Sequence, residues 1–350
     1  MELRENIPLA PYTTLGIGGP ARYLCAVASE AELTEALAIA NEKHLDTFIL
    51  GGGSNLLISD AGFDGLVIRM AIHGIARDGN TLRVGAGEPW DAFVQQTVDA
   101  GLAGIECLAG IPGTVGGTPV QNVGAYGEEV SSTITIVRAF DTHANQFVDL
   151  DNVQCGFAYR TSIFNTVAKG RYIVARVDFQ LTPNGTPNLK YVDLAKRFAD
   201  KPQPSLADIA TAVREIRATK GMVTAAPNQN GEYPLDRDPD TCSAGSFFRN
   251  PIVPAGAVAH IAQEAGVAEV PHWPAGDGMT KLPAAWLIER AGFSKGFAMG
   301  HAAISSRHTL ALTNKGGAKA AEIAALRDHV AKIVRERFHV QLEQEPVSVP

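Results

Sequence analysis

Short apolar runs alternate with polar residues through the first half of the chain, and this pattern predicts β-strands. The predicted strands cover residues 22–27, 46–50, 81–87, 133–141, 146–150 and 171–181. After the first of them, Ser29 and Glu32 have the spacing of a helix capping box, and apolar residues then recur on one helical face. The chain is therefore expected to begin with a small strand–helix–strand unit whose helix covers residues 30–43.

Patterns with the helical period recur later in the chain. One follows Pro89 and ends at Gly101, and another begins at Ser205. Further helices are predicted near 255–266, 283–291 and 318–338, with strands at 297–300, 309–314 and 340–349. The stretch 221–241 is rich in Pro, Asn, Asp and Gly, which predicts a long loop or a domain boundary.

A first glycine-rich stretch, GGGSN at residues 51–55, follows a predicted strand. A dinucleotide-binding fingerprint would require a helix next, whereas the chain continues in extended runs. A P-loop is excluded as well, because no Gly-Lys-Ser or Gly-Lys-Thr closes the glycines. Two interpretations remain open: a turn whose backbone amides hold an anion, and a purely structural glycine turn.

A second glycine-rich stretch, residues 101–127, holds eight glycines and very few charges. A flexible linker is one interpretation, but linkers are usually polar and this stretch is threaded with leucine, isoleucine and valine. Two separate stretches of exposed backbone suit a ligand with a central pyrophosphate, since backbone amides neutralise phosphate without side-chain charge.

Composition narrows the classes of function. With 45% apolar and 19% charged residues, a chain of 350 residues can bury a sizeable core in two or three domains. The net charge of -7 argues against a nucleic-acid partner or an anionic membrane surface, and no run of eighteen apolar residues occurs. The four cysteines and nine histidines lack the spacings of metal sites, so no metal site is expected. We expect a cytoplasmic protein.

Two groups of side chains are candidates for chemistry. Tyr159 and Arg160 interrupt an apolar stretch between two predicted strands. Arg214, Arg217 and Lys220 gather toward the C-terminal end of the helix that begins at Ser205. The basic group would either offset the helix dipole or supply the local positive charge that an anionic ligand needs.

Six motifs occur together along the chain: TTLGIGGPA, GGGSNLL, GIPGTVGGTPVQNVGAYG, FAYRTSIF, AGSFFRNP and LEQE. Their order and approximate spacing resemble those of the UDP-N-acetylenolpyruvoylglucosamine reductase (MurB) family, in its longer type with a tyrosine-bearing loop. The resemblance implies an α+β protein with a bipartite FAD-binding region of the vanillyl-alcohol-oxidase (PCMH) type and a C-terminal α+β substrate-binding domain. The implied domains are 1–72, 73–232 (closed by a C-terminal strand at 339–350) and 233–338.

By this resemblance, the two glycine-rich stretches would form two sides of a cradle for the pyrophosphate of non-covalently bound FAD. The implied FAD contacts are Gly51, Gly52, Gly53, Ser54, Asn55, Leu56, Gly113, Thr114, Gly116 and Gly124.

The implied reaction reduces the enolpyruvyl ether of UDP-N-acetylglucosamine to the D-lactyl ether of UDP-N-acetylmuramate, with NADPH as the reductant. It belongs to peptidoglycan precursor synthesis, and so to cell-wall biogenesis, cell shape, the cell cycle and cell division. Hydride addition to the vinyl carbon leaves negative charge beside the carboxylate, so the site needs an electrophile and an acid.

The family pattern suggests which residues fill these roles. Arg160 would bind the carboxylate and stabilise the developing charge, and Ser246 would donate the proton. Glu345 would act with Arg160, although Glu343 is expected on the same face of the final strand and stays open as the working carboxylate.

The implied substrate contacts are Tyr126, Tyr159, Tyr191, Lys220 and Asn250, with Lys220 at the UDP pyrophosphate. The connection from Lys220 to Ser246 is longer than usual for the family. The protein is expected to be a monomer. Two other classes stay in view: a flavin-dependent oxidase of the same fold, and a non-catalytic protein that binds flavin or a sugar nucleotide.

Overall fold

The computed structural model describes residues 1–201 and 203–350 and divides into two compact units. Unit 1 comprises Met1–Ile7, Ala21–Gly53 and Asp64–Ala218, and unit 2 comprises Pro8–Pro20, Ser54–Phe63 and Thr219–Pro350. Each unit has its own hydrophobic core. The three-domain division expected from the sequence stays a prediction.

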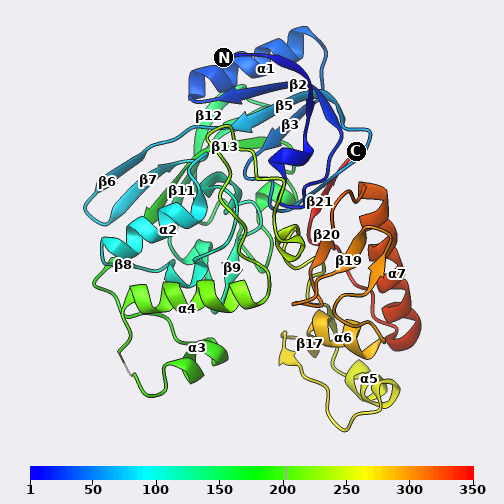
Figure 1. Ribbon diagram of the computed structural model, residues 1–350. Coiled ribbons are helices and arrows are strands. Elements are labelled where there is room, and N and C mark those ends of the chain that lie inside the picture. The colour runs from blue at the N-terminus through cyan, green and yellow to red at the C-terminus, as the bar shows by residue number, and fades with distance from the viewer. Residues whose placement is uncertain (202) are drawn as a thin grey trace. The chain divides into compact units, whose positions relative to one another are not determined.

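Unit 1 is built on two sheets (Figure 1). The first has the order β1-β2-β5-β3 and consists of β1 (Arg4–Pro8), β2 (Pro20–Val27), β5 (Phe63–Met70) and β3 (Thr47–Leu50). The second has the order β12-β11-β13-β7-β6 and consists of β12 (Gln146–Asp151), β11 (Ile134–Asp141), β13 (Tyr172–Gln180), β7 (Thr81–Gly85) and β6 (Ile75–Asp78). All pairs in the second sheet are antiparallel, whereas β3 and β5 are parallel.

The helices of unit 1 are α1 (Glu30–Glu42), α2 (Trp90–Asp99), α3 (Val192–Arg197) and α4 (Leu206–Thr219). The predicted start of α1 is confirmed, because the Ser29 side chain accepts a hydrogen bond from the Glu32 amide at 3.1 Å. The helix after Pro89 is confirmed too, and its Trp90 and Phe93 pack with Phe179 of β13 in the core. Helix α3 was not predicted.

The second glycine-rich stretch folds into short elements instead of a linker. They are β8 (Leu102–Ala103), η2 (Glu106–Leu108), η3 (Val115–Gly117) and β9 (Gly124–Ala125), and β10 (Glu128–Glu129) and η4 (Val130–Ser132) follow directly after the stretch. Strand β8 pairs with β14 (Thr182–Pro183), and β9 pairs with β10. Its apolar side chains Ile105, Leu108 and Val115 are fully buried, so the linker interpretation is wrong.

Unit 2 confirms the three predicted helices as α5 (Ala257–Ala265), α6 (Ala284–Arg290) and α7 (Ala320–Phe338). One small sheet contains β15 (Ile252–Pro254), β17 (Met279–Lys281) and β16 (Trp273–Pro274), and the other contains β18 (Ala298–Met299), β19 (Ala302–Ile304) and β20 (Leu312–Asn314). Helix α7 packs beside β19 and β20 (Figure 1). None of the helices in the described ranges combines the length and apolar character that a membrane crossing needs.

The last strand is shorter than predicted. Only β21 (Val347–Val349) forms, parallel to β4 (Leu56–Ile58), so a single strand over 340–349 is wrong. Gln344 instead makes an isolated antiparallel bridge with Phe248. The chain changes partners at Pro346, a residue that has no N–H to continue a ladder.

Candidate functional site

The two glycine-rich stretches meet in unit 1. A Cβ added to Gly52 would lie 2.4 Å from the Cα of Gly113, and one added to Gly51 would lie 3.0 Å from the Thr114 Oγ1. Gly113 also has a φ of 125°, which residues with a Cβ rarely adopt. The glycines are therefore required so that two backbone segments can approach each other closely.

Backbone hydrogen bonds hold the second stretch against the β7–α2 connection. Trp90 donates its amide to the Gly113 carbonyl at 3.0 Å, and the Val115 amide donates to the Glu88 carbonyl at 2.9 Å. By contrast, the amides of Gly53, Gly113 and Thr114 donate to no residue among those the structure describes. Backbone amides of this kind, in segments without bulky side chains, fit the pyrophosphate of FAD.

Replacing Gly52 by alanine is expected to remove FAD from the protein. The new Cβ would collide with backbone at Gly113, and this backbone cannot move aside as a flexible side chain could. We expect the FAD content of the purified variant, measured by absorbance after denaturation, to fall about tenfold or more.

The matched control is Gly117→Ala in the same segment, where a Cβ would meet nothing within 4 Å and φ is not restricted. This control should keep its flavin. Full FAD content in Gly52→Ala would contradict the assignment of this contact to the cofactor cradle.

Helices α2 and α4 clamp the turn at Gly110. The Asp91 carboxylate accepts a hydrogen bond from the Gly110 amide at 2.6 Å, and the Arg217 Nε donates to the Gly110 carbonyl at 2.9 Å. Arg214 in turn donates to Asp91 at 2.8 Å. Two of the three predicted basic residues therefore support the glycine-rich backbone, a role that the sequence did not suggest.

Arg160 lies at a tight turn between β12 and β13. Ala158 and Thr161 exchange backbone hydrogen bonds of 2.9 and 3.0 Å, so Tyr159 and Arg160 form the corner. Arg160 has a φ of 55°, a left-handed conformation that costs a residue with a Cβ about 1–2 kcal/mol. Strain of this size at a charged residue is typical of functional positions.

Side-chain hydrogen bonds join this turn to the segment that carries Tyr126. The Asn122 side chain donates to the Ala158 carbonyl at 3.1 Å, and the Ser162 hydroxyl donates to the Val120 carbonyl at 2.6 Å. Asn122 and Tyr126 also have left-handed φ angles, of 44° and 50°. Asn122 was not predicted as a site residue.

Tyr126 connects to two further elements of unit 1. Its ring meets the Tyr191 ring edge-on at a centroid distance of 5.0 Å, and its hydroxyl is hydrogen-bonded to the Arg217 guanidinium. Burial raises the pKa of Tyr126, partly offset by the Arg217 charge. Burial lowers the pKa of Arg217, and the positive charge of Arg160 lowers it further. The two guanidinium groups are therefore close enough to repel each other. Unit 1 thus brings Arg160, Tyr126 and Tyr191 together with a buried arginine.

In unit 2, Ser246 and Glu345 lie on neighbouring strand-like segments. The Glu345 amide donates to the carbonyl of Phe247, the residue after Ser246, at 2.9 Å. Glu345 is half-buried, whereas Glu343 is exposed. The Asn55 side chain donates to the Glu345 carbonyl at 3.3 Å, so the end of the first glycine-rich stretch is tied to this segment.

Lys220 begins the part of unit 2 that follows α4. Together with Lys295 it helps to lower the pKa of His308 to about 4, although burial is the largest cause. His308 is therefore uncharged near neutral pH and adds no positive charge beside the two lysines. Asn250 has a structural contact, because its Oδ1 accepts a hydrogen bond from the Ala284 amide at the start of α6 at 2.9 Å.

The predicted site residues fall into two sets, one in each unit. Unit 1 carries Gly51, Gly52, Gly53, Gly113, Thr114, Gly116, Gly124, Tyr126, Tyr159, Arg160 and Tyr191, and unit 2 carries Ser54, Asn55, Leu56, Lys220, Ser246, Asn250 and Glu345.

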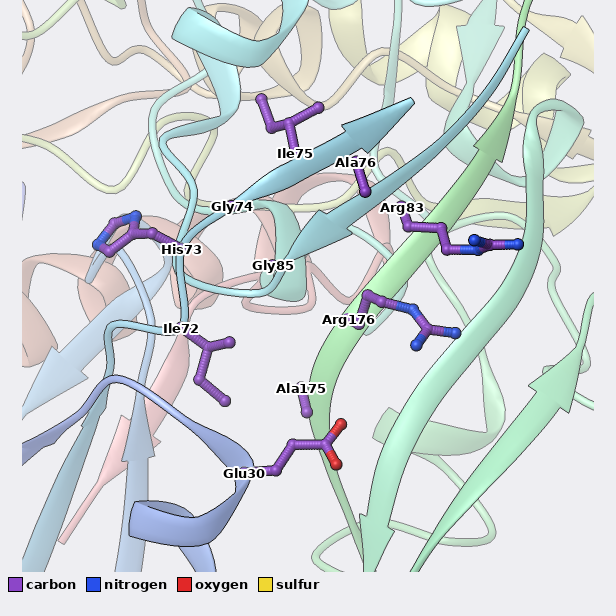
Figure 2. A pocket seen from close by; sticks show the side chains of 10 residues that line it. All are labelled: Glu30, Ile72, His73, Gly74, Ile75, Ala76, Arg83, Gly85, Ala175 and Arg176. Carbon is purple, nitrogen blue, oxygen red and sulfur yellow. The ribbon is translucent and has the colours of Figure 1, made fainter. Parts of the chain in front are cut away.

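A separate groove of about 490 Å³ lies in unit 1 beside β6, β7 and β13 (Figure 2). Its charged side chains already have partners: Arg176 pairs with Asp178 at 2.6 Å, and Glu30 pairs with Arg138 at 2.5 Å. None of the predicted site residues lines it. Because its charges are satisfied within the protein, the groove offers an anionic ligand less than the glycine-rich stretches do.

Comparison with known proteins shows which protein family this chain is related to. A family described as UDP-N-acetylenolpyruvoylglucosamine reductase, C-terminal domain, matches residues 237–349, and an FAD binding domain family matches residues 21–144. The UDP-N-acetylenolpyruvoylglucosamine reductase of Thermobifida fusca is 45% identical over 99% of this chain and 97% of its own length. That of Streptomyces coelicolor is 46% identical over 99% of this chain and 90% of its own length.

This chain belongs to the UDP-N-acetylenolpyruvoylglucosamine reductase family. A crystal structure of the reductase from Thermus caldophilus, with 28% sequence identity, covers 100% of this chain at a TM-score of 0.65. The expected fold class, a bipartite FAD-binding region followed by an α+β substrate-binding domain, is confirmed by these matches. The role of the first glycine-rich stretch as one side of the FAD cradle stays a prediction.

Proposed function

We infer that this chain is a flavoenzyme that reduces UDP-N-acetylglucosamine enolpyruvate to UDP-N-acetylmuramate, with FAD as cofactor and NADPH as reductant. The observation that carries this conclusion is the relationship to reductases of that name over 99% of the chain. The close contact between Gly52 and Gly113 supports it, because it gives unit 1 a backbone surface suited to FAD.

FAD would be held at its pyrophosphate by the glycine-rich stretches, with the amides of Gly53, Gly113 and Thr114 as donors. When bound, FAD supplies the chemistry of hydride transfer from NADPH to the vinyl carbon of the substrate. The Asp91–Arg217 clamp at Gly110 would keep the second stretch in place while ligands exchange.

Arg160 and Ser246 would carry the remaining chemistry. The Arg160 guanidinium binds the substrate carboxylate and stabilises the negative charge that develops beside it, a role suited to a planar group that stays protonated. The Ser246 hydroxyl delivers a proton to that carbon. Serine is a weak acid, but a carbanion is a strong enough base to take its proton when the geometry is fixed.

Glu345 is the carboxylate that we propose to act with Arg160. It is half-buried and its amide is bonded beside Ser246, whereas Glu343 points into a more exposed environment. A carboxylate removed from bulk water interacts more strongly with an arginine than an exposed one does. Tyr126, Tyr159, Tyr191, Lys220 and Asn250 are proposed to contact the sugar nucleotide, with Lys220 at the pyrophosphate.

We further propose that the enzyme is a cytoplasmic monomer that acts in cell-wall biogenesis and so affects cell shape and division. Sedimentation of the purified protein tests the monomeric state, and fractionation of the producing cells tests the location.

An anaerobic titration tests the function. NADPH should bleach the yellow protein, and the enolpyruvyl sugar nucleotide should restore the colour with formation of one UDP-N-acetylmuramate per flavin. Restoration by oxygen but not by the sugar nucleotide would indicate a flavin oxidase. A protein that NADPH does not bleach would be a non-catalytic flavin binder.

A further inference from the structure

Two glutamates of unit 1 form a buried carboxyl pair, which hydrogen bonds connect to the segments that carry Tyr126 and Tyr191. Glu106, which begins η2, is 1% exposed, and Glu128 on β10 is 8% exposed. Their carboxyl groups hydrogen-bond to each other, and with the Cys107 sulfur they place three polar atoms within 4.8 Å of one another. Two ionised carboxylates in such contact would repel strongly, so the pair needs a proton or a cation between its oxygens.

Backbone amides already occupy part of this cluster. The Cys107 amide donates to Glu128 Oε2 at 2.9 Å, and the Gly104 amide donates to Glu106 Oε2 at 2.7 Å. Burial, followed by the neighbouring Glu106, raises the pKa of Glu128 to about 8, and burial also raises the pKa of the Cys107 thiol. A cation would require all three groups to lose their protons in a buried place, so a shared proton fits the surroundings better.

Asn188 links the pair to the tyrosines. Its amide donates to Glu106 Oε1 at 3.3 Å, and its carbonyl accepts from the Cys107 sulfur at 3.4 Å. The Asn188 side chain donates to the carbonyl of Gly127, the residue after Tyr126, at 2.9 Å. It also accepts from the amide of Lys190, the residue before Tyr191, at 2.9 Å.

We propose that Glu106 and Glu128 are positioning residues that share one proton and, through Asn188, hold Tyr126 and Tyr191 in the arrangement that binds the sugar nucleotide. The identity of that ligand rests on the proposed function, whereas the shared proton and the anchoring of the segment do not. Ionisation of the second carboxyl would put two negative charges in a dry site and loosen residues 187–191.

Other charged and titratable groups lie beside the pair or beside the two tyrosines. Cys107 on η2 is in contact with Glu128, whereas Glu129, the next residue on β10, accepts a hydrogen bond from the Asn122 side chain. Arg217 on α4 and Asp193 at the start of α3 act on Tyr126, and Asp193 also acts on Tyr191. Burial raises the pKa of Tyr126 and Tyr191 above the ordinary value of 10, so both stay neutral when Glu128 titrates. The Cys107 thiol, with its raised pKa, stays protonated as well.

The pH dependence has a defined sign. The unfolded chain loses the Glu128 proton near its ordinary pKa of 4.5, whereas the folded pair keeps it to about 8. The stability contributed by the protonated pair is therefore full below the first value and is lost as pH rises to the second. Glu128→Gln keeps both hydrogen-bonding functions without a titration, so its melting temperature relative to wild type should rise with pH, by roughly 5 °C at the upper end.

Hydrogen exchange and kinetics together test the proposal. Backbone amide exchange of peptides covering 187–191 is measured at about pH 6.5 and pH 9, corrected for intrinsic rates, in wild type, Glu128→Gln and the exposed control Glu42→Gln. We expect protection in wild type and the control to fall about tenfold at the higher pH, and protection in Glu128→Gln to stay within about twofold. The KM for the enolpyruvyl sugar nucleotide should rise in parallel in wild type and stay flat in Glu128→Gln.

The two readouts separate two failures. An equal response of exchange to pH in wild type and Glu128→Gln would overturn the shared proton, whether or not the protein turns over this substrate. If exchange responds to pH as expected but the wild-type KM for the sugar nucleotide does not change with pH, the positioning role is overturned. Exchange as expected in a protein that fails to turn over would count against the proposed function and leave the carboxyl pair supported.

Discussion

Ser246→Ala is expected to reduce its flavin with NADPH at a rate within about twofold of wild type and to lose reoxidation by the enolpyruvyl substrate about a thousandfold. Only the second half-reaction needs a proton at carbon, and a methyl group cannot supply it. Ser246 lies between Gly245 and two buried phenylalanines, so removing one oxygen leaves the packing of this segment intact. Anaerobic stopped-flow absorbance of the flavin measures both steps.

Ser294→Ala is the matched control, because Ser294 is an exposed serine of the same unit. It should behave as wild type in both half-reactions. Ser246→Cys should recover part of the reoxidation rate, since a thiol can also donate a proton. An equal slowing of both half-reactions in Ser246→Ala would refute the assignment of this hydroxyl as the proton donor.

Arg160→Lys is expected to lower the reoxidation rate by roughly 10²–10³-fold and to weaken substrate binding. Lysine keeps the charge but loses the planar fork that engages both carboxylate oxygens. Arg160→Asn should lower the rate further. It should nevertheless melt no earlier than wild type, because asparagine tolerates the left-handed φ of 55° at this turn.

The melting temperature distinguishes a chemical role from a structural one. Differential scanning calorimetry is run on both variants and on Arg77→Lys, a change at an exposed arginine of the same unit that should affect neither property. A parallel loss of stability and rate in Arg160→Asn would indicate that the arginine mainly supports the fold.

Much of the fold could be predicted from the sequence because its elements are local. The capping pattern at Ser29 and the stripe after Pro89 fix helices without reference to distant residues. The final strand could not be predicted correctly, since its partners lie at 247–249 and at β4, far away in sequence. Helix α3 is short and charged, and its only buried side chain is Leu194, so it carries little periodic signal.

The candidate site, too, could be predicted only where its residues carry a local signal in the sequence. Glycine-rich stretches are visible in the sequence, and their contact at Gly52 and Gly113 follows once both are expected to bind one ligand. Arg217 was interpreted as a residue at a helix end, although it lies four residues after Val213 and eight after Ile209, on the buried stripe of α4. That spacing was the available sign of a buried arginine. No local sequence pattern distinguishes Glu106, Glu128 or Asn188 as a site residue, because their contacts depend on the tertiary fold.

The interleaving of the units limits how the protein can be dissected. The chain passes between unit 1 and unit 2 at residues 7/8, 20/21, 53/54, 63/64 and 218/219. A fragment that covers only 237–349 would lack β4, leaving β21 with an open hydrogen-bonding edge prone to aggregation. Chimaeras with relatives would therefore have to exchange residues 8–20 and 54–63 along with the C-terminal part, and modular recombination at one junction would fail.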